Sequence, residues 1–570
     1  MDKNDIQSFE PQEMVSWYHI PQLAATGIRS IVSELFGSFA DKREIMSTLA
    51  SDKNEVFDYS KQEEIWVDYM SDLGDGFDST YTMAHLLAQA NIEVDKQPLP
   101  RAQILILGGD QVYPTATREE YKNRFKGPYQ MAFPYNAASN HPHLYAVPGN
   151  HDWYDGLTNF LKVFCQQRFI GNWKTVQTRS YFALQLPHNW WIWAIDIQLE
   201  ADIDQMQLEY FERIKNKMDI GSKVILCTAE PSWVYFANGT NAGYKSLRYF
   251  ENRFLQDELK PFEYVATLTG DLHHYSRYTS TNKEIKTQKI TSGGGGAFLH
   301  PTHNLPDQIK DLREGDIALQ QTFPSKKESK ALLFKNFLFP WYNKTFSVYM
   351  GAAFLLIAWI IQSKAYGINE SKTFIDYIAA VPFFQFKAFF YELGQLYINN
   401  LILLGFNILL ILFLYNIANI PTNLKYQPSI YKIGSAMHGA IQIFVFYLVL
   451  WAVSHIHWAL PKPFDKIMLQ IEILLAGGFA VSTIFGIHLV LTNLILGNHD
   501  NEAFSSLRYE GFKNILRMHI QKDSITIYPI GVREVCDWTP DVASMTATTK
   551  DTLKTTLIEA PILIEYKNEY

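Results

Sequence analysis

Apolar and polar positions follow different patterns in the two halves of the chain. Up to about residue 328 short apolar runs alternate with mixed stretches, whereas long apolar tracts with few charges occupy residues 346–498. The short runs are rich in β-branched and aromatic residues and end in turn residues, which is typical of strands. They predict strands within residues 63–72, 102–110, 143–150, 180–187, 190–198, 223–230, 264–271 and 288–296.

Helices are predicted before and between these strands. Residues 80–91 and 204–218 are candidate helices, and Asp202 or Asp204 is a suitable N-cap for the second. Residues 23–36 form an earlier candidate helix. Its apolar residues recur at helical spacing and are expected to face a core: Ile28, Ile31, Val32 and Leu35. The alternation predicts an α/β layered sandwich with functional residues at the carboxyl ends of strands.

The second half of the chain predicts a small helical membrane domain of about four spans. The tract at 345–363 has no charged residue and is long enough to cross a bilayer. Three further tracts predict spans at 396–418, 433–453 and 467–496. Residues 375–390 are interrupted by a proline and a lysine, and we interpret them as an interfacial or re-entrant stretch.

Charges beside the first span predict its orientation. The lysines before it are Lys326, Lys327, Lys330, Lys335 and Lys344. Such an excess marks the cytoplasmic side, so the N-terminal domain is expected in the cytoplasm of a bacterial inner membrane. Four spans return the tail to the same side, and its apolar runs at 515–520, 524–530 and 561–566 predict strands that pack back on the sandwich.

Composition narrows the function further. The net charge of -8 gives no support for nucleic-acid binding, which normally leaves a basic surface. The three cysteines are far apart and match neither a disulfide framework nor a zinc spacing. We therefore interpret them as buried apolar residues in a reducing compartment.

Residue types that bind metals gather in loops that follow strands. These loops are SDLGDG at 71–76, GGDQVY at 108–113, PGNHDW at 148–153, TAEPSW at 228–233 and TGDLHHY at 269–275. A pair of divalent ions needs a shared carboxylate and ligands on separate loops that converge at one end of a sheet. The sequence therefore predicts a two-metal centre.

The order of these loops resembles the calcineurin-like metallophosphoesterases, whose pattern is DxH, GDxx, GNH(D/E), H and GHxH. The resemblance covers about residues 63–298 and includes the glycine-rich KITSGGGGAF after the last motif. A glycine in the DxH motif and a tyrosine completing GDxxY are closer to the purple acid phosphatase branch. The family implies a four-layer β-sandwich flanked by helices, here followed by the all-α transmembrane bundle and a short C-terminal β segment.

The resemblance implies a set of metal ligands. Asp72 and His273 would bind the first metal, Asp110 would bridge both, and Asn150 would bind the second. Tyr113 stands where the purple acid phosphatases use a tyrosinate, although an ordinary packed aromatic is the alternative.

Three motif positions depart from the family pattern. Gly74 replaces the DxH histidine unless Asp75 serves instead, and Glu230 and Asp271 replace two further histidines. An oxygen-rich shell favours manganese or magnesium over zinc, with iron or zinc as alternatives. The replacements at 230 and 271 are themselves ligand types, which favours a working site over a disabled one.

The resemblance also implies the groups that act on the substrate. His151 would contact the phosphate and stabilise or protonate the leaving group, with Asp152 orienting its ring. Asn150 and His274 would line the substrate site with His151. A hydroxide bridging the two metals would attack phosphorus in line.

These inferences together predict a membrane-anchored phosphoesterase acting on a phosphate mono- or diester. A lipid-linked phosphate or headgroup and another phosphorylated small molecule are the alternative substrates. The alternative is a membrane signalling or transport component that binds a phosphorylated ligand without cleaving it. The predicted domains are a helical extension at 1–62, the phosphoesterase at 63–325, the membrane domain at 345–496 and a β-rich tail at 497–570. A second GNHD at 497–500 follows a membrane span and is interpreted as an interfacial loop.

Overall fold

The computed structural model describes residues 9–36, 43, 55–138, 140–197, 202–255, 261–312, 315–363, 372–421, 425–456, 458, 460, 461 and 463–566. The chain divides into two compact units. The first contains residues 1–15, 25–330 and 508–570, and the second contains residues 16–24 and 331–507.

One sheet of the first unit is built from the middle of the sequence. Strands β10, β11, β12 and β14 run parallel in its centre, and β9 and β13 pair antiparallel to β10 and β14. In spatial order the strands are β1 (Phe57–Asp58), β9 (Phe182–Gln185), β10 (Trp190–Ala194), β11 (Lys223–Cys227), β12 (Glu263–Thr269), β14 (Gln288–Ser292), β13 (Tyr275–Ser280), β16 (Gly315–Phe323) and β15 (Gln308–Leu312).

The second sheet joins strands from both ends of the chain. Strands β2, β5 and β6 run parallel, and β17 from the C-terminal tail pairs antiparallel to β2. In spatial order the strands are β21 (Thr556–Leu557), β18 (Ser524–Val532), β17 (Lys513–Ile520), β2 (Ile65–Met70), β5 (Ile104–Leu107), β6 (His143–Ala146), β8 (Trp173–Thr175) and β7 (Phe169–Ile170), with β22 (Ile562–Glu565) also on β18. Two small hairpins are β3 (Asn91–Val94) with β4 (Gln97–Pro100), and β19 (Thr539–Asp541) with β20 (Thr546–Thr548).

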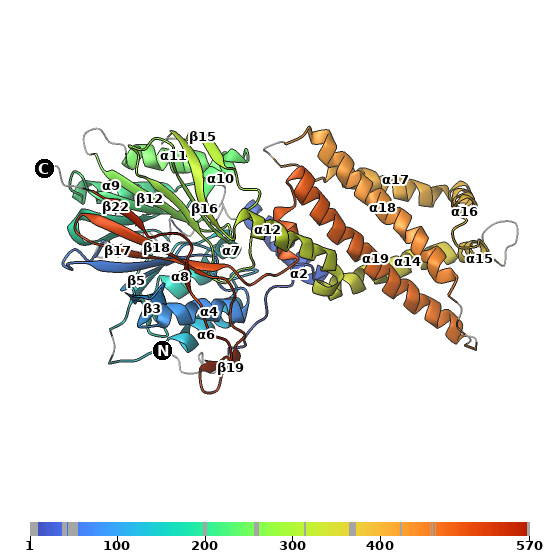
Figure 1. Cartoon of the computed structure of the whole chain (residues 1–570), viewed down its shortest axis with the longest axis horizontal. Helices are drawn as coiled ribbons and strands as arrows, with labels where there is room; N and C mark the ends of the chain where they lie inside the picture. The colour runs from blue at the N-terminus through green and yellow to red at the C-terminus, as the bar shows by residue number, and fades with distance from the viewer. Residues whose placement is uncertain are drawn as a thin grey trace. The chain divides into compact units, whose positions relative to one another are not determined.

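Helices cover the outer faces of the two sheets, which gives the predicted four-layer sandwich (Figure 1). One apolar core joins the second sheet to α4 and α8, and another joins the first sheet to α9 and α11. The helices of this unit are α4 (Phe77–Ala88), α5 (Arg118–Glu120), η3 (Tyr121–Lys126), α6 (Gly127–Ala132), α7 (Asn150–Trp153), α8 (Thr158–Phe164), η4 (Pro187–Asn189), α9 (Gln205–Lys217), α10 (Ser232–Ala237), α11 (Ala242–Phe254) and α12 (Lys326–Leu333).

The predicted strands and helices of this unit are confirmed, with ends shifted by a few residues. Asp204 is the N-cap of α9, and its side chain accepts a hydrogen bond from the Gln207 N–H at 2.9 Å. The early helix is α2 (Ile20–Phe36), but the prediction that Ile28 faces a core is wrong because its side chain is 63% exposed. The side chains of the other apolar residues assigned to that face lie outside the described ones.

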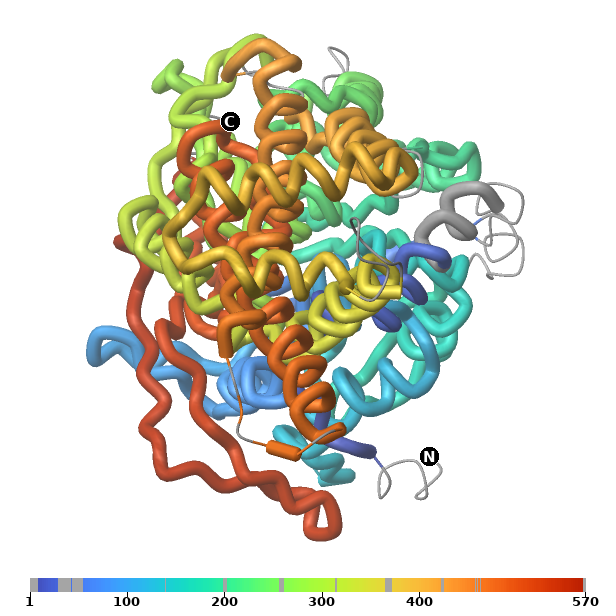
Figure 2. Tube along the Cα trace, turned by 90° about the vertical axis from the view of Figure 1, so that its right-hand side faces the viewer, coloured from blue at the N-terminus to red at the C-terminus, as the bar shows by residue number. Residues whose placement is uncertain are grey.

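The C-terminal tail is fixed to the second sheet by a buried ion pair. The Arg517 guanidinium on β17 donates to both carboxylate oxygens of Asp68 on β2, at 2.8 and 2.7 Å, and to the Leu99 carbonyl at 3.0 Å. Both charged side chains have no exposed surface. Beyond β18 the tail, drawn in red, carries the β19–β20 hairpin, which projects from the sheets (Figures 1 and 2).

The second unit is helical and contains the apolar tracts. Three of its described helices are long and apolar enough to cross a membrane: α14 (Lys344–Gln362), α18 (Pro428–Ser454) and α19 (Phe464–Leu496). Its shorter helices are η5 (Phe334–Leu338), α13 (Phe339–Tyr342), α15 (Phe374–Ala379), α16 (Phe386–Asn399), α17 (Leu401–Asn416) and α20 (Asp500–Ser505).

The span predicted at 396–418 is not one straight helix. The chain bends by 101° between α16 and α17, so a fourth span exists only if this bent pair counts as one. Asn400 lies at the bend with non-helical backbone, and its side chain accepts a hydrogen bond from the Leu403 N–H at 3.2 Å as the N-cap of α17. A local cap that the apolar pattern does not reveal therefore begins a new helix here.

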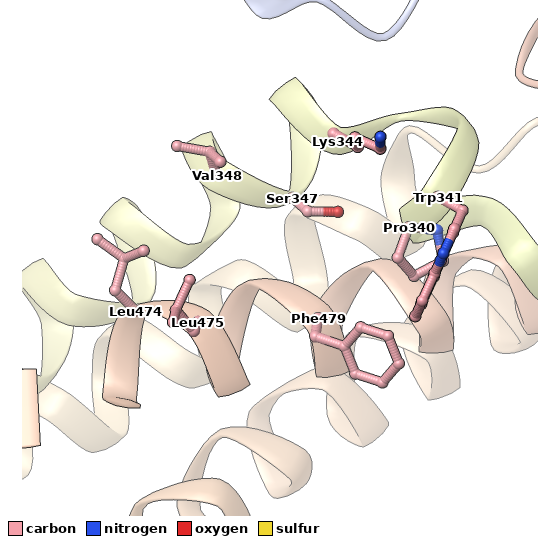
Figure 3. Close-up of a pocket in the computed structure, with 8 residues that line it drawn as sticks. All are labelled: Pro340, Trp341, Lys344, Ser347, Val348, Leu474, Leu475 and Phe479. Carbon is pink, nitrogen blue, oxygen red and sulfur yellow. The ribbon is translucent and has the colours of Figure 1, made fainter. Parts of the chain in front are cut away.

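Two further features belong to this helical unit. Figure 3 shows a cavity of about 270 Å³ beside α14 and α19, in which apolar side chains such as Leu474 and Phe479 are joined by Trp341 and Lys344. The second GNHD forms the turn between α19 and α20, where the Asp500 carboxylate accepts a hydrogen bond from the Asn493 side chain at 2.7 Å.

Candidate functional site

Three of the predicted metal ligands lie on loops that the two sheets bring together. Asp72 follows β2, Asp110 follows β5, and Asp271 follows β12 of the other sheet. The Asp271 N–H donates to Asp72 Oδ1 at 3.1 Å, and the Asp72 N–H donates to the Gly109 carbonyl at 3.0 Å. The carboxyl ends of these strands therefore meet at one place, as the order of the loops predicted.

All three aspartates have a left-handed backbone. Their φ angles are 58° for Asp72, 47° for Asp110 and 66° for Asp271. For a residue other than glycine this conformation is uncommon and costs about 1–3 kcal/mol, and it persists where the surrounding structure enforces it. This conformation turns the chain sharply after each strand. The three carboxylates are therefore brought close together.

Tyr113 lies among the predicted first-metal ligands. Its hydroxyl donates toward Asp72 Oδ1 at 3.3 Å and Asp110 Oδ2 at 3.2 Å, and it lies 2.9 Å from His273 Nε2. Burial and the neighbouring carboxylates raise the pKa of the Tyr113 hydroxyl well above its usual value. The structure therefore brings Tyr113 into the site. Its hydroxyl contacts Asp72, Asp110 and His273, which are predicted to bind the first metal.

His273 is oriented by hydrogen bonding and stacking. Its Nδ1 donates to the Phe298 carbonyl at 2.7 Å, which leaves Nε2 with its lone pair directed toward Tyr113. The ring of His300 stacks on it with a centroid distance of 3.8 Å. A ring held through one nitrogen is the usual arrangement of a metal-binding histidine. Sequence reasoning left His300 without a role, and only its spacing from His273 was a signal.

Asn150 presents an unsatisfied oxygen at the start of α7. Its Oδ1 is buried and makes no hydrogen bond, although an amide oxygen normally finds a donor when it is buried. Beside it, a Cβ on Gly149 would come within 2.1 Å of Asp110 Oδ1, so only glycine leaves room for that carboxylate. The loop is shaped around Asp110 and leaves the Asn150 oxygen available to a cation.

The structure changes the role assigned to Asp152. Its carboxylate accepts hydrogen bonds from the N–H groups of Gly149 at 2.9 Å and Gln111 at 3.3 Å, and from the Tyr121 hydroxyl. The ring of His151 is instead oriented through Nδ1, which donates to the Pro114 carbonyl at 2.8 Å. Asp152 therefore fixes the two loops to each other, and Pro114 orients the His151 ring.

Glu230 and Asp271, which replace two family histidines, lie on the same side of the site. The Tyr235 hydroxyl donates to Asp271 Oδ2, a partner that sequence reasoning missed. The Glu230 carboxylate lies against Gly243, where an added Cβ would come within 1.9 Å of its Oε1. Burial, and then the charge of Asp271, raise the pKa of Glu230 to about 7. Both replacements thus remain within electrostatic reach of each other.

The site concentrates negative charge away from water. Burial and the charge of Asp271 raise the pKa of Asp110 to about 8, and burial followed by its charged neighbours raises that of Asp72. Burial also lowers the pKa of His151 to about 4. Buried carboxylates this close together need protons or cations to be stable, and divalent cations are the ligand that such a cluster favours.

Gly74 has a structural reason to be glycine. Its backbone forms a bridge with Val112, and an added Cβ would come within 2.6 Å of the Gln111 carbonyl oxygen. Asp75 is the other candidate for the missing DxH histidine, but its carboxylate accepts hydrogen bonds from the N–H groups of Val15 at 2.7 Å and Phe298 at 3.3 Å. Asp75 therefore anchors the N-terminal segment, and neither residue replaces the histidine.

We expect Gly74→Ala to destabilise the first unit by about 1–3 kcal/mol, because the new methyl group overlaps a backbone oxygen that cannot move freely. The thermal unfolding midpoint of the purified variant measures this effect. Gly27→Ala is the control, since a Cβ at Gly27 has no neighbour within 4 Å. Equal midpoints for both variants would show that the Gly74 backbone is not tightly packed.

His274 is predicted to line the substrate site. Its side chain has no exposed surface, and burial lowers its pKa to about 4. Its neighbour His273 contacts the Tyr113 hydroxyl. The burial agrees with a packing role for His274, and its contact with a substrate stays a prediction.

The donor set fits divalent metal ions. Among the described residues no three His, Cys, Asp or Glu side chains already stand in a metal-binding arrangement. The chemistry nevertheless fits, because the Asn150 oxygen is orphaned and His273 Nε2 has its lone pair in the site. The carboxylates of Asp72 and Asp110 are buried, and that of Asp271 is half-buried. Five oxygen donors or more with one imidazole suit manganese or magnesium, and also iron.

Comparisons with known proteins give one family match and two similar solved structures. Residues 65–275 match the model of the calcineurin-like phosphoesterase family. The chain resembles the structure of a purple acid phosphatase from yellow lupin (Lupinus luteus) seeds, with 14% identity, a TM-score of 0.30, and 46% of this chain and 48% of that chain covered. It also resembles the structure of PhoD, with 12% identity, a TM-score of 0.25, and 42% and 58% covered.

The alignments span about half the length of these two solved structures. A comparison with curated proteins gives no match. Residues 65–275, within the first unit, thus form a domain that matches the calcineurin-like phosphoesterase family model.

Proposed function

We propose that this protein is a membrane-anchored phosphoesterase that hydrolyses a phosphate mono- or diester at the loops of Asp72, Asp110 and Asp271. The observation that carries the proposal is the left-handed backbone of all three aspartates. Strained residues that gather at one point imply a functional demand, since nothing in packing alone requires three of them together.

The residues proposed to hold two divalent ions are Asp72, Asp110, Tyr113, Asn150, Glu230, Asp271 and His273. When bound, the ions supply positive charge that acidifies water and stabilises the charge developing on phosphoryl oxygens. Manganese or magnesium is the proposed pair, because the donors are mostly oxygen.

The other site residues orient these donors and the substrate. The His151 N–H donates to Asp110 Oδ1 at 2.9 Å and so fixes the direction of that carboxylate. The Pro114 carbonyl fixes the direction of the His151 ring beside Asp110, which suits the ring to contact a phosphate or leaving-group oxygen. Asp152 keeps this loop in place through Gly149 and Gln111. His151 is thus the proposed substrate contact and proton donor, and Asp152 is a positioning residue.

A lipid headgroup is the proposed substrate class. The helical unit includes helices long and apolar enough to span a bilayer, and these confine the phosphoesterase domain to a membrane surface. Confinement raises the local concentration of any phosphorylated lipid. A soluble phosphate ester is the alternative that the assay below includes.

The experiment uses full-length protein in detergent, stripped with a chelator and then supplied with manganese, magnesium, zinc or iron(II). Substrates are p-nitrophenyl phosphate, bis(p-nitrophenyl) phosphate and a short-chain phosphatidic acid. We expect no turnover after chelation and recovery with manganese or magnesium. Folded, metal-loaded protein that cleaves none of them, yet binds the phosphatidic acid, would favour the non-cleaving ligand-binding role instead.

The proposed orientation places the phosphoesterase domain in the cytoplasm of a bacterial cell. Its support is the group of lysines that precedes α14. A protease added to inside-out membrane vesicles is expected to digest the domain, and right-side-out vesicles are expected to protect it. Protection only in the inside-out preparation would reverse the orientation.

A further inference from the structure

A cavity of about 860 Å³ lies in the first unit between η3, α6, α8 and β7. Its volume is in the range of pockets that hold small organic ligands. Helices α6 and α8 can be followed in Figure 1. The cavity is lined by other residues than the predicted metal ligands, so it is separate from the phosphoesterase site in composition.

The lining of this cavity is strongly cationic. Among the described residues that line it there is no Asp or Glu. The cations are Arg118, Lys122, Lys126, Lys162 and Arg168. Acidic neighbours lie outside the lining. The Glu119 carboxylate lies 3.5 Å from Lys122 Nζ, and its side chain is 68% exposed, which weakens the pair. Asp155 and Asp152 instead accept hydrogen bonds from the neutral lining residues Asn159 and Tyr121. The whole chain has a net charge of -8, so the positive charge of this lining is opposite in sign to that of the protein as a whole.

The geometry of η3 explains how several of these side chains share one face. Tyr121–Lys126 is a π-helix, in which residues four and five positions apart lie nearly above one another. Lys122 and Lys126 are four apart, and Tyr121 and Lys126 are five apart. An α-helix would also place Lys122 and Lys126 on one face, so the π-helix chiefly adds Tyr121 to the face of Lys126. Short π-helices are uncommon and occur frequently at functional sites, which is a second observation in favour of a ligand.

The inner end of the cavity supplies neutral groups beneath the charges. Gln130 and Ile170 are buried there, and Asn159 from α8 adds an amide. Its Nδ2 donates to the Ala116 carbonyl at 2.9 Å and to Asp155 Oδ2 at 2.7 Å, so the amide is held in a fixed position. Amide and apolar groups in the same lining as five cations fit an anion that has an uncharged part.

Tyr121 connects the cavity to the phosphoesterase site. Its side chain lines the cavity, and its hydroxyl donates to Asp152 Oδ1. Asp152 in turn accepts from the N–H groups of Gly149 and Gln111, which flank Asp110 in the folded site. The Tyr121 side chain therefore lies between a ligand in the cavity and the loops that position Asp110.

We propose that this cavity binds a phosphorylated anion with more than one negative charge, at a site separate from the metal centre. Arg and Lys side chains bind phosphate oxygens through charge-assisted hydrogen bonds, and several cations around one volume select multiply charged anions over single ones. The anion is either a soluble phosphate compound or the headgroup of an anionic phospholipid, since both present the same chemistry.

Binding is tested by calorimetry on full-length protein in detergent with a chelator present, so that the metal centre cannot hold the anion. The probes are inorganic pyrophosphate, dioctanoyl phosphatidylinositol bisphosphate and dioctanoyl phosphatidylcholine. Lys122→Gln with Lys126→Gln removes two cations, and Lys245→Gln with Lys283→Gln removes two exposed lysines outside the lining. We expect the first pair to weaken binding about tenfold or more and the second to leave it unchanged.

The choice of probes distinguishes a soluble phosphate ligand from a lipid headgroup. It also distinguishes binding in this cavity from binding at the phosphoesterase site. Tighter binding of the bisphosphate lipid than of pyrophosphate identifies a headgroup, and the reverse identifies a soluble ligand. Binding must also survive Asp110→Asn. No binding of either anion, or equal weakening in both lysine pairs, overturns the proposal. Binding that is lost in Asp110→Asn assigns the anion to the metal centre and equally overturns it, whatever the hydrolysis assay shows.

Discussion

Asp110→Asn is expected to lower kcat/KM for phosphate ester hydrolysis by about a thousandfold or more. Asp110 is the proposed shared ligand of both ions, so its loss removes charge stabilisation worth several kcal/mol in the transition state. The amide keeps the size of the carboxyl group, and its oxygen still accepts from the His151 N–H. Asparagine also tolerates the left-handed backbone at this position. The variant should therefore fold while losing the charge that holds the cations.

A matched control exists elsewhere in the same unit. Asp311 also has a left-handed backbone, with φ 60°, but it is exposed and lies on β15 outside the site. Asp311→Asn makes the same chemical change in the same backbone conformation. Initial rates and the amount of bound manganese, measured for both variants and the parent protein, test whether Asp110 is the shared ligand. Normal turnover in Asp110→Asn would exclude Asp110 as the shared ligand.

Arg517→Met is expected to destabilise the first unit by about 3–5 kcal/mol. The substitution leaves Asp68 buried without its cation and removes a hydrogen bond to the Leu99 carbonyl. It also removes the side-chain link between β17 of the tail and β2, the strand that leads to Asp72, and leaves their backbone pairing. Thermal unfolding of the purified protein, followed by circular dichroism, measures the loss.

Arg533→Met is the control for this second prediction. It removes an arginine from the same tail, but Arg533 pairs with Glu328 at the surface, where its side chain is 56% exposed. An exposed pair contributes about 1 kcal/mol or less. Replacing Arg517 and Asp68 together by Met and Leu should restore part of the stability, because no charge is then left unpaired. An Arg517→Met variant as stable as Arg533→Met would contradict the assigned role of the buried pair.

Local patterns in the sequence were enough to predict the strands, the ligand-bearing loops and the class of chemistry. Each strand has its own apolar run, and Asp72, Asp110 and Asp271 each follow one directly. The fold class and the family were predictable for the same reason, since the motifs occur in order along the chain. Asp204 as an N-cap is another local signal that the structure confirms.

Predictions failed where the answer depends on residues far apart in sequence. The Asp152 carboxylate accepts a hydrogen bond from Tyr121, and Asp271 accepts one from Tyr235. The sequence separation of each pair follows no pattern that predicts the contact. The break at Asn400 was missed for a different reason, because it depends on one local side-chain cap within an apolar tract that is long enough to continue.

The sequence by itself therefore determined the order of elements, the residue types at the site and the apolar helices, because hydrophobic period and turn residues act over a few positions. Only the tertiary structure decided that Gly74 has no room for a side chain, since the obstacle is the Gln111 carbonyl on another loop. It also decided that Arg517 and Asp68, 449 positions apart, form one buried pair. Close packing and the desolvation of charge act between neighbours in space, and no local pattern records them.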